Sequence, residues 1–134
     1  MGSSKTLCMI AHLDVFERSV ACLVGDLDEA LEKFRLADNV PRGSIREIRG
    51  VIRGMKIEFA GITVYTRFGA VIYLPAWHSL TLVHELWHAT RHILKSLAIK
   101  YEEAEETGAC IMDFLFRSFV DTRPEARRLW RPAE

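Results

Sequence analysis

Two histidines and a glutamate near the middle of the chain have the residue types and the spacing of a metal site. His84, Glu85 and His88 stand in the order His-Glu-x-x-His, inside an apolar run without glycine or proline. On an α-helix, residues four apart lie on one face, about 6 Å apart along the axis, so both imidazoles can bind one ion. Glu85 follows the first ligand and can act as general base on a metal-activated water.

A plainer interpretation leaves these three side chains hydrogen-bonded in a core, or exposed along one stripe of a helix. The flanking residues are apolar and predict a buried helix: Leu82, Val83, Leu86, Trp87 and Ala89. Buried charged groups need partners, because desolvating an unpaired charge is costly, and a metal ion supplies such a partner. We therefore favour the metal site.

A catalytic zinc ion usually takes three protein ligands and leaves one position for water. A second helix, expected over residues 102–120, offers several carboxylates near one another on its surface: Glu102, Glu105, Glu106 and Asp113. A solvated acidic first turn, stabilised by the helix dipole, explains most of them equally well. Glu106 differs because it precedes the small residues Ala109 and Cys110, where two helices can pack closely. His92 lies another turn beyond His88, so a role beside the site or on the surface is expected for it.

The elements around this motif predict an α+β fold. Residues 7–13 suit a strand or the start of a helix, and residues 19–24 suit a buried strand. A helix is expected over residues 26–37, with Asp26 as its N-cap. Residues 44–53 are ambiguous, because isoleucines recur at helical spacing but Gly50 weakens a helix.

Three short runs, residues 55–59, 62–67 and 70–74, predict an antiparallel meander. Ser79 is the expected N-cap of the helix over residues 80–97, which carries the histidines. The predicted architecture is a small, mainly antiparallel twisted sheet packed against this helix and the C-terminal helix. We expect the edge strand to line a substrate cleft, where a peptide can add as an extra strand.

Composition sets the class of protein. The 134 residues are 49% hydrophobic and 27% charged, which fits one domain over residues 1–134. The formal net charge is zero, so no nucleic-acid partner is expected, and the basic residues between Arg42 and Lys56 suit a solvated face. No apolar run could cross a membrane and no secretory signal is present, so a cytoplasmic location is expected. Residues 1–5 suit a disordered segment or a cloning remnant, and residues 124–134 a short tail.

The cysteines Cys8, Cys22 and Cys110 are odd in number, widely spaced and flanked by apolar residues. This pattern predicts buried free thiols in a reducing compartment rather than a disulfide framework. The sequence leaves the oligomeric state open, because its three tryptophans suit an interface as well as a core.

Two stretches resemble small phage-encoded zincin-like metallopeptidases, which are related in layout to ImmA/IrrE-type peptidases. They are residues 82–89, with His-Glu-x-x-His, and residues 105–115, with two glutamates before an apolar run. The resemblance also covers residues 15–20 and 70–75. It implies a minimal zincin-like fold that binds one Zn²⁺ per chain. Glu106 matches the family's third ligand, but Thr107 and Gly108 stand where the family tends to have alanine and an aromatic residue. Glu105 therefore stays open as the alternative ligand.

The resulting prediction is a zinc-dependent metallopeptidase of narrow specificity, phage or mobile-element encoded, that acts on a peptide or protein substrate. Glu85 is the expected base, and the oxyanion needs a donor. Residues with suitable side chains are Tyr65, Tyr73, His78, Arg91 and Tyr101, and the sequence does not rank them. The alternative is a non-catalytic interaction protein on a zincin-like frame, with a structural or vestigial metal site.

Overall fold

The computed structural model describes residues 6–55 and 59–120. Its elements are, in order, β1 (Leu7–Leu13), the 3₁₀ turn η1 (Asp14–Phe16), β2 (Arg18–Val24), α1 (Leu27–Asp38), α2 (Arg42–Arg53), β3 (Ile62–Thr66), β4 (Gly69–Leu74), α3 (Ser79–Ser96) and α4 (Tyr101–Val120). The α+β class predicted from the sequence is confirmed. Segments 1–5 and 124–134, for which disorder or a tail was expected, lie outside the described residues.

The four described strands form one mixed sheet in the order β1-β2-β4-β3. The β1–β2 and β3–β4 pairs are antiparallel, whereas β2 and β4 are parallel, with Val20 opposite Ala70 and Val24 opposite Leu74. The predicted meander is therefore a single hairpin, and the chain inserts β4 between β2 and β3. This order leaves β3 at an edge of the sheet.

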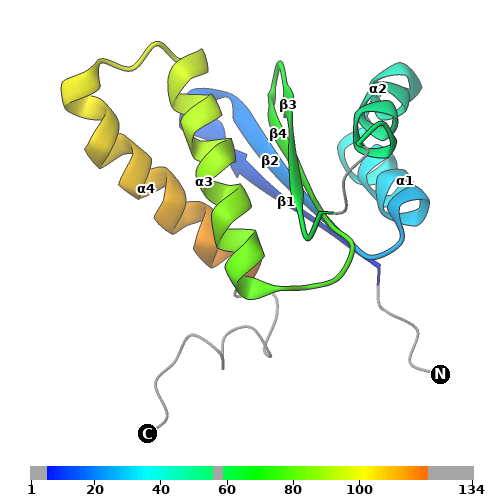
Figure 1. Cartoon of the computed structure of the whole chain (residues 1–134). Coiled ribbons are helices and arrows are strands. Elements are labelled where there is room, and N and C mark those ends of the chain that lie inside the picture. The colour runs from blue at the N-terminus through cyan, green and yellow to red at the C-terminus, as the bar shows by residue number, and fades with distance from the viewer. Residues whose placement is uncertain (1–5, 56–58, 121–134) are drawn as a thin grey trace, which may run out of the picture.

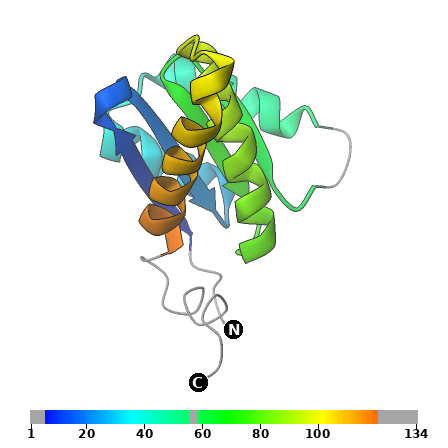
Figure 2. The ribbon, with the colours of Figure 1, turned by 90° about the vertical axis from the view of Figure 1, so that its left-hand side faces the viewer.

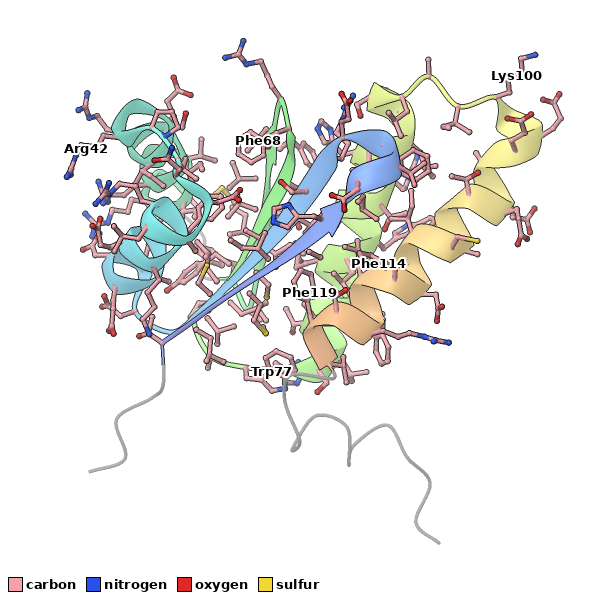
Figure 3. The ribbon with its side chains drawn as sticks, turned by 180° about the vertical axis from the view of Figure 1, so that it is seen from behind. Arg42, Phe68, Trp77, Lys100, Phe114 and Phe119 are labelled. Atoms are coloured by element: carbon pink, nitrogen blue, oxygen red, sulfur yellow. The ribbon has the colours of Figure 1, made fainter. Side chains whose placement is uncertain are left out.

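Helices cover both faces of the sheet and make three layers (Figure 1). α1 and α2 pack on one face, and α3 and α4 pack on the other, where they lie side by side (Figure 2). The buried side chains of β2 alternate between the layers: Cys22 belongs to the core under α3 and α4, and Leu23 to the core under α1 and α2. Phe119 of α4 is fully buried in the core under α3 and α4 (Figure 3).

The cap predicted for the first helix is confirmed. The Asp26 carboxylate caps α1 by accepting a hydrogen bond from the Glu29 N–H at 2.9 Å. The ambiguous stretch forms α2, and its isoleucines are buried against the sheet. Gly50 has open space around it, so it costs helix propensity without disturbing the packing.

Two local predictions need correction. The cap of α3 is His78, whose Nδ1 accepts from the Thr81 N–H at 3.2 Å, and Ser79 is the first residue of the helix. Met55 and Phe59 are outside any strand, and residues 56–58, the centre of the first predicted run, lie outside the described part.

The cysteine prediction holds only in part. Cys8, Cys22 and Cys110 are free, but only Cys22 is buried; Cys8 is half-buried and Cys110 is exposed. Among the described residues, no helix is long and apolar enough to span a membrane.

The basic stretch of α2 lies on a solvated face, as expected. Arg49 and Arg53 both donate to the Asp28 carboxylate, at 3.0 and 2.6 Å. Arg42 projects from the outer side of α2, away from the sheet (Figure 3). These contacts join α2 to α1 through Arg49 and Arg53.

Candidate metal centre

The two histidines lie on the side of α3 that faces away from the sheet. The opposite side of the helix is an apolar stripe that is buried in the core. Leu86 and Ala89 are completely buried against the sheet. His84 and His88 lie four residues apart and away from that stripe, with their Nε2 atoms 3.1 Å apart. Their rings meet edge to face, with centroids 4.7 Å apart.

This separation suits two ligands of one tetrahedral ion. Two Zn–N bonds of about 2.0–2.1 Å at a tetrahedral angle place the nitrogens about 3.3 Å apart. The Nε2 atoms of His84 and His88 nearly meet this requirement. Within the described residues, one ligand atom from each of His84, Glu85 and His88 lies within 4.8 Å of the others, a group that could hold a metal ion.

Glu85 points from α3 toward β3 rather than to solvent, and only 6% of it is exposed. Its Oε1 accepts a hydrogen bond of 2.8 Å from the Thr63 hydroxyl, which also lies 3.2 Å from the Glu85 main-chain oxygen. Its Oε2 lies 3.9 Å from His84 Nε2. The carboxylate is thus anchored through one oxygen and faces the histidines with the other. Sequence reasoning missed Thr63, which stands 22 positions before Glu85.

The structure does not bring Glu106 into this group. Gly108 is a buried residue of α4 that faces α3: a Cβ placed there would lie 3.1 Å from Leu94 Cδ1. At 100° per residue, Glu106 is about 160° from Gly108 around the helix, on the outer side. Glu106 is exposed, and the Cys110 thiol lies 3.9 Å from its Oε1. The expectation that α4 packs closely through Ala109 and Cys110 was wrong, because both are exposed.

Glu105, the alternative ligand, lines the same open groove as His88. This groove has a volume of about 970 Å³ and is lined by Tyr65, Trp87, His88, Arg91, His92, Leu94, Lys95, Ile99, Ala104 and Glu105. Gly108 of α4 lies beside Leu94 and Thr90 of α3. The two helices are antiparallel, so Glu105, which precedes Gly108, and His88, which precedes Thr90, lie on opposite sides of this contact (Figure 1). Among the described residues, the group that could hold a metal ion includes neither Glu105 nor Glu106. No α4 carboxylate among the described residues therefore joins the histidines.

Two of the candidate oxyanion donors have other roles. Tyr73 is buried in the core under α1 and α2, on the opposite face of the sheet from α3, so this candidate was wrong. Its hydroxyl donates to the Gly25 carbonyl at 2.7 Å. Burial, followed by the charges of Asp26 and Asp28, raises the pKa of Tyr73. His78 uses its Nδ1 to cap α3, with the Thr81 hydroxyl 2.8 Å away.

The candidates that remain near the histidines are Arg91 and Tyr65, which share the groove with His88. The Tyr65 ring stacks on His92, with centroids 4.4 Å apart, and His92 Nε2 lies 3.3 Å from the Thr66 carbonyl. His92 thus links α3 to β3 beside the site, in agreement with the role expected for it. The side chain of Tyr101 lies outside the described part of the structure.

Comparisons with protein-family models, with curated proteins and with solved structures returned no match. What defines this chain is therefore its own architecture: a three-layer α+β domain with a His-Glu-His cluster at the edge of its sheet. The resemblance to zincin-like peptidases stays a prediction from the sequence.

Proposed function

We propose that the protein is a zinc-dependent metallopeptidase in which His84 and His88 hold the ion and Glu85 is the general base. One observation carries the proposal: the Nε2 atoms are 3.1 Å apart and the Glu85 carboxylate lies 3.9 Å from His84. Two histidine ligands beside a separately anchored carboxylate supply two of the three protein ligands usual for a catalytic zinc ion, together with the base that metal-assisted hydrolysis uses.

The chemistry divides between the ion and the side chains. A bound zinc ion would lower the pKa of water toward about 7 and polarise a carbonyl group. His84 and His88 provide neutral nitrogen ligands. Glu85 accepts a proton through Oε2 and returns it to the leaving amine, because Oε1 is already engaged by Thr63.

The substrate we propose is an extended peptide. β3 is an edge strand beside Glu85, and an edge strand offers unpaired main-chain groups to which a peptide can add. The neighbouring groove exposes Tyr65 and Trp87, 52% and 48% of which are accessible. These aromatic surfaces, together with Arg91, supply contacts for side chains next to the scissile bond, so the specificity is narrow. Free thiols support a reducing, cytoplasmic location.

A second function, a binding protein with a structural or vestigial metal site, has one observation in its favour. Within the described residues no third ligand from another element reaches the histidines, and Glu85 completes the cluster instead. In that case Glu85 would be a ligand rather than a base. The two functions therefore differ in what Glu85 does.

The test is to measure zinc content and peptide cleavage together. Purified wild type should hold about one zinc ion per chain and cleave members of a peptide library, detected by mass spectrometry. Glu85→Gln should keep the zinc and lose hydrolysis, whereas His88→Ala should lose both. His92→Ala is the matched control on the same helix and should keep its zinc. A zinc-free wild type would refute the proposal, and a fully active Glu85→Gln would rule out Glu85 as the base.

A further inference from the structure

We propose that Thr63 is a positioning residue that fixes the general base from the edge strand; its catalytic consequence rests on the proposed function. The hydroxyl of Thr63 donates to Glu85 Oε1 at 2.8 Å, and among the described residues no other side chain hydrogen-bonds to this carboxylate. A buried carboxylate with one such donor has one preferred rotamer, because any other would leave Oε1 unsatisfied.

The hydrogen bond gives the two carboxylate oxygens of Glu85 different roles. Oε1 is held by Thr63, while Oε2 lies on the side of His84, 3.9 Å from Nε2. If Thr63 released Oε1, the carboxylate could rotate, and Oε2 would lose its fixed place beside the histidines. Thr63 thus determines that Glu85 faces the cluster through one oxygen, in the orientation that proton transfer requires.

The chain before β3 packs against the side chain of the same glutamate. A Cβ added at Gly61 would lie 3.2 Å from Glu85 Cγ and 2.7 Å from both Leu74 Cδ2 and Thr81 Cγ2. The close approach of the main chain at Gly61 therefore leaves Glu85 little room to move away from Thr63. Glycine is the residue that permits such an approach.

Alternation along β3 places two anchors on the face toward α3. Thr63 and Tyr65 point to this face: Thr63 hydrogen-bonds to Glu85 and Tyr65 stacks on His92. Val64, between them, belongs to the core on the other face. The strand proposed to receive the substrate is thus the strand that holds the base, so substrate register and base position are set by one element.

The first experiment compares Thr63→Val and Thr63→Ser in the full chain, using a cleaved library peptide and zinc titration. Thr63→Val should lower kcat at least tenfold and leave KM and the zinc Kd within threefold, whereas Thr63→Ser keeps the hydroxyl and should restore kcat to within threefold of wild type. The matched control is Thr66→Val, because the buried Thr66 hydroxyl has no hydrogen-bond partner among the described residues. A kcat for Thr63→Val within twofold of wild type would overturn the proposal.

The second experiment needs no activity. A double-mutant cycle of Thr63→Val with Glu85→Ala, read from chemical unfolding of the metal-free protein, isolates the side-chain contact. We expect a coupling of about tenfold in the unfolding equilibrium constant, and less than twofold would overturn the proposal. Coupling in a protein that binds zinc but cleaves no peptide would refute both the peptidase function and the catalytic role of Thr63, leaving the hydrogen bond as a structural one.

Discussion

Replacing Glu106 by alanine should leave zinc binding nearly unchanged, although the resemblance to zincin-like peptidases favours this residue as the third ligand. The reason is the rotation of α4 about its own axis. Gly108 faces α3 and approaches Leu94, so Glu106, about 160° away, lies on the outer side. The Glu106→Ala substitution therefore removes an exposed carboxylate that has no route to the histidines.

The expected loss of zinc affinity differs widely between the histidine variant and the two glutamate variants. Structural zinc in zinc-finger peptides, with four protein ligands, binds with about 10–16 kcal/mol; this is roughly 3 kcal/mol for each ligand, or more than a hundredfold in Kd. His88→Ala should lose that amount because His88 Nε2 lies 3.1 Å from its partner nitrogen. Glu106→Ala should stay within threefold of wild type. Glu105→Ala should do the same, since Glu105 is not part of the metal-binding group found among the described residues.

The assay is competition against a chromophoric chelator at fixed pH and salt, with circular dichroism to verify folding. The reasoning would be refuted by a tenfold or larger loss of affinity in Glu106→Ala, because that residue could then reach the ion only through a different placement of α4. A loss confined to Glu105→Ala would instead show that its side chain crosses the groove to His88.

Two further predictions concern groups away from the metal site. Tyr73→Phe removes a buried hydrogen bond to Gly25 and should cost about 1–2 kcal/mol of unfolding free energy, read as a lower Tm by calorimetry. Because burial raises the folded pKa of Tyr73 above 10.0, its contribution to stability is present below pH 10 and is lost as the pH rises further; Tyr73→Phe should lessen this alkaline decline. Burial raises the pKa of Cys8 from 9.0 to about 11, so at pH 8 its alkylation should be about a hundredfold slower than that of an ordinary thiol, while exposed Cys110 should be labelled first. Equal labelling of both cysteines in a peptide map would contradict this.

The parts of the fold that sequence reasoning predicted are those that local chemistry determines. The Asp26 cap and the helical spacing after it locate α1 without reference to the rest of the chain. The i, i+4 spacing of His84 and His88 likewise depends only on helix geometry, and their nitrogens meet as expected. Each of these features is complete within one element.

The predictions that were wrong depend on which face of a helix or strand packs against the neighbouring element. All residues of β4 are buried, so its sequence has no polar alternation to show that Tyr73 faces away from α3. In α4, Gly108 was noted only as a departure from the family pattern, but it is buried against α3, beside Leu94. With Gly108 facing α3, Glu106 lies on the outer side of the helix.

The candidate site is divided between α3 and β3, and this division explains why the motif revealed only half of it. His84, Glu85 and His88 are adjacent in sequence, but the group that orients Glu85 comes from Thr63, on a strand placed beside α3 by the order β1-β2-β4-β3. Had β3 paired with β2 instead, the Glu85 carboxylate of the same helix would have lacked its hydrogen bond from Thr63. The orientation of the Glu85 carboxylate is therefore a property of the sheet order as much as of the motif.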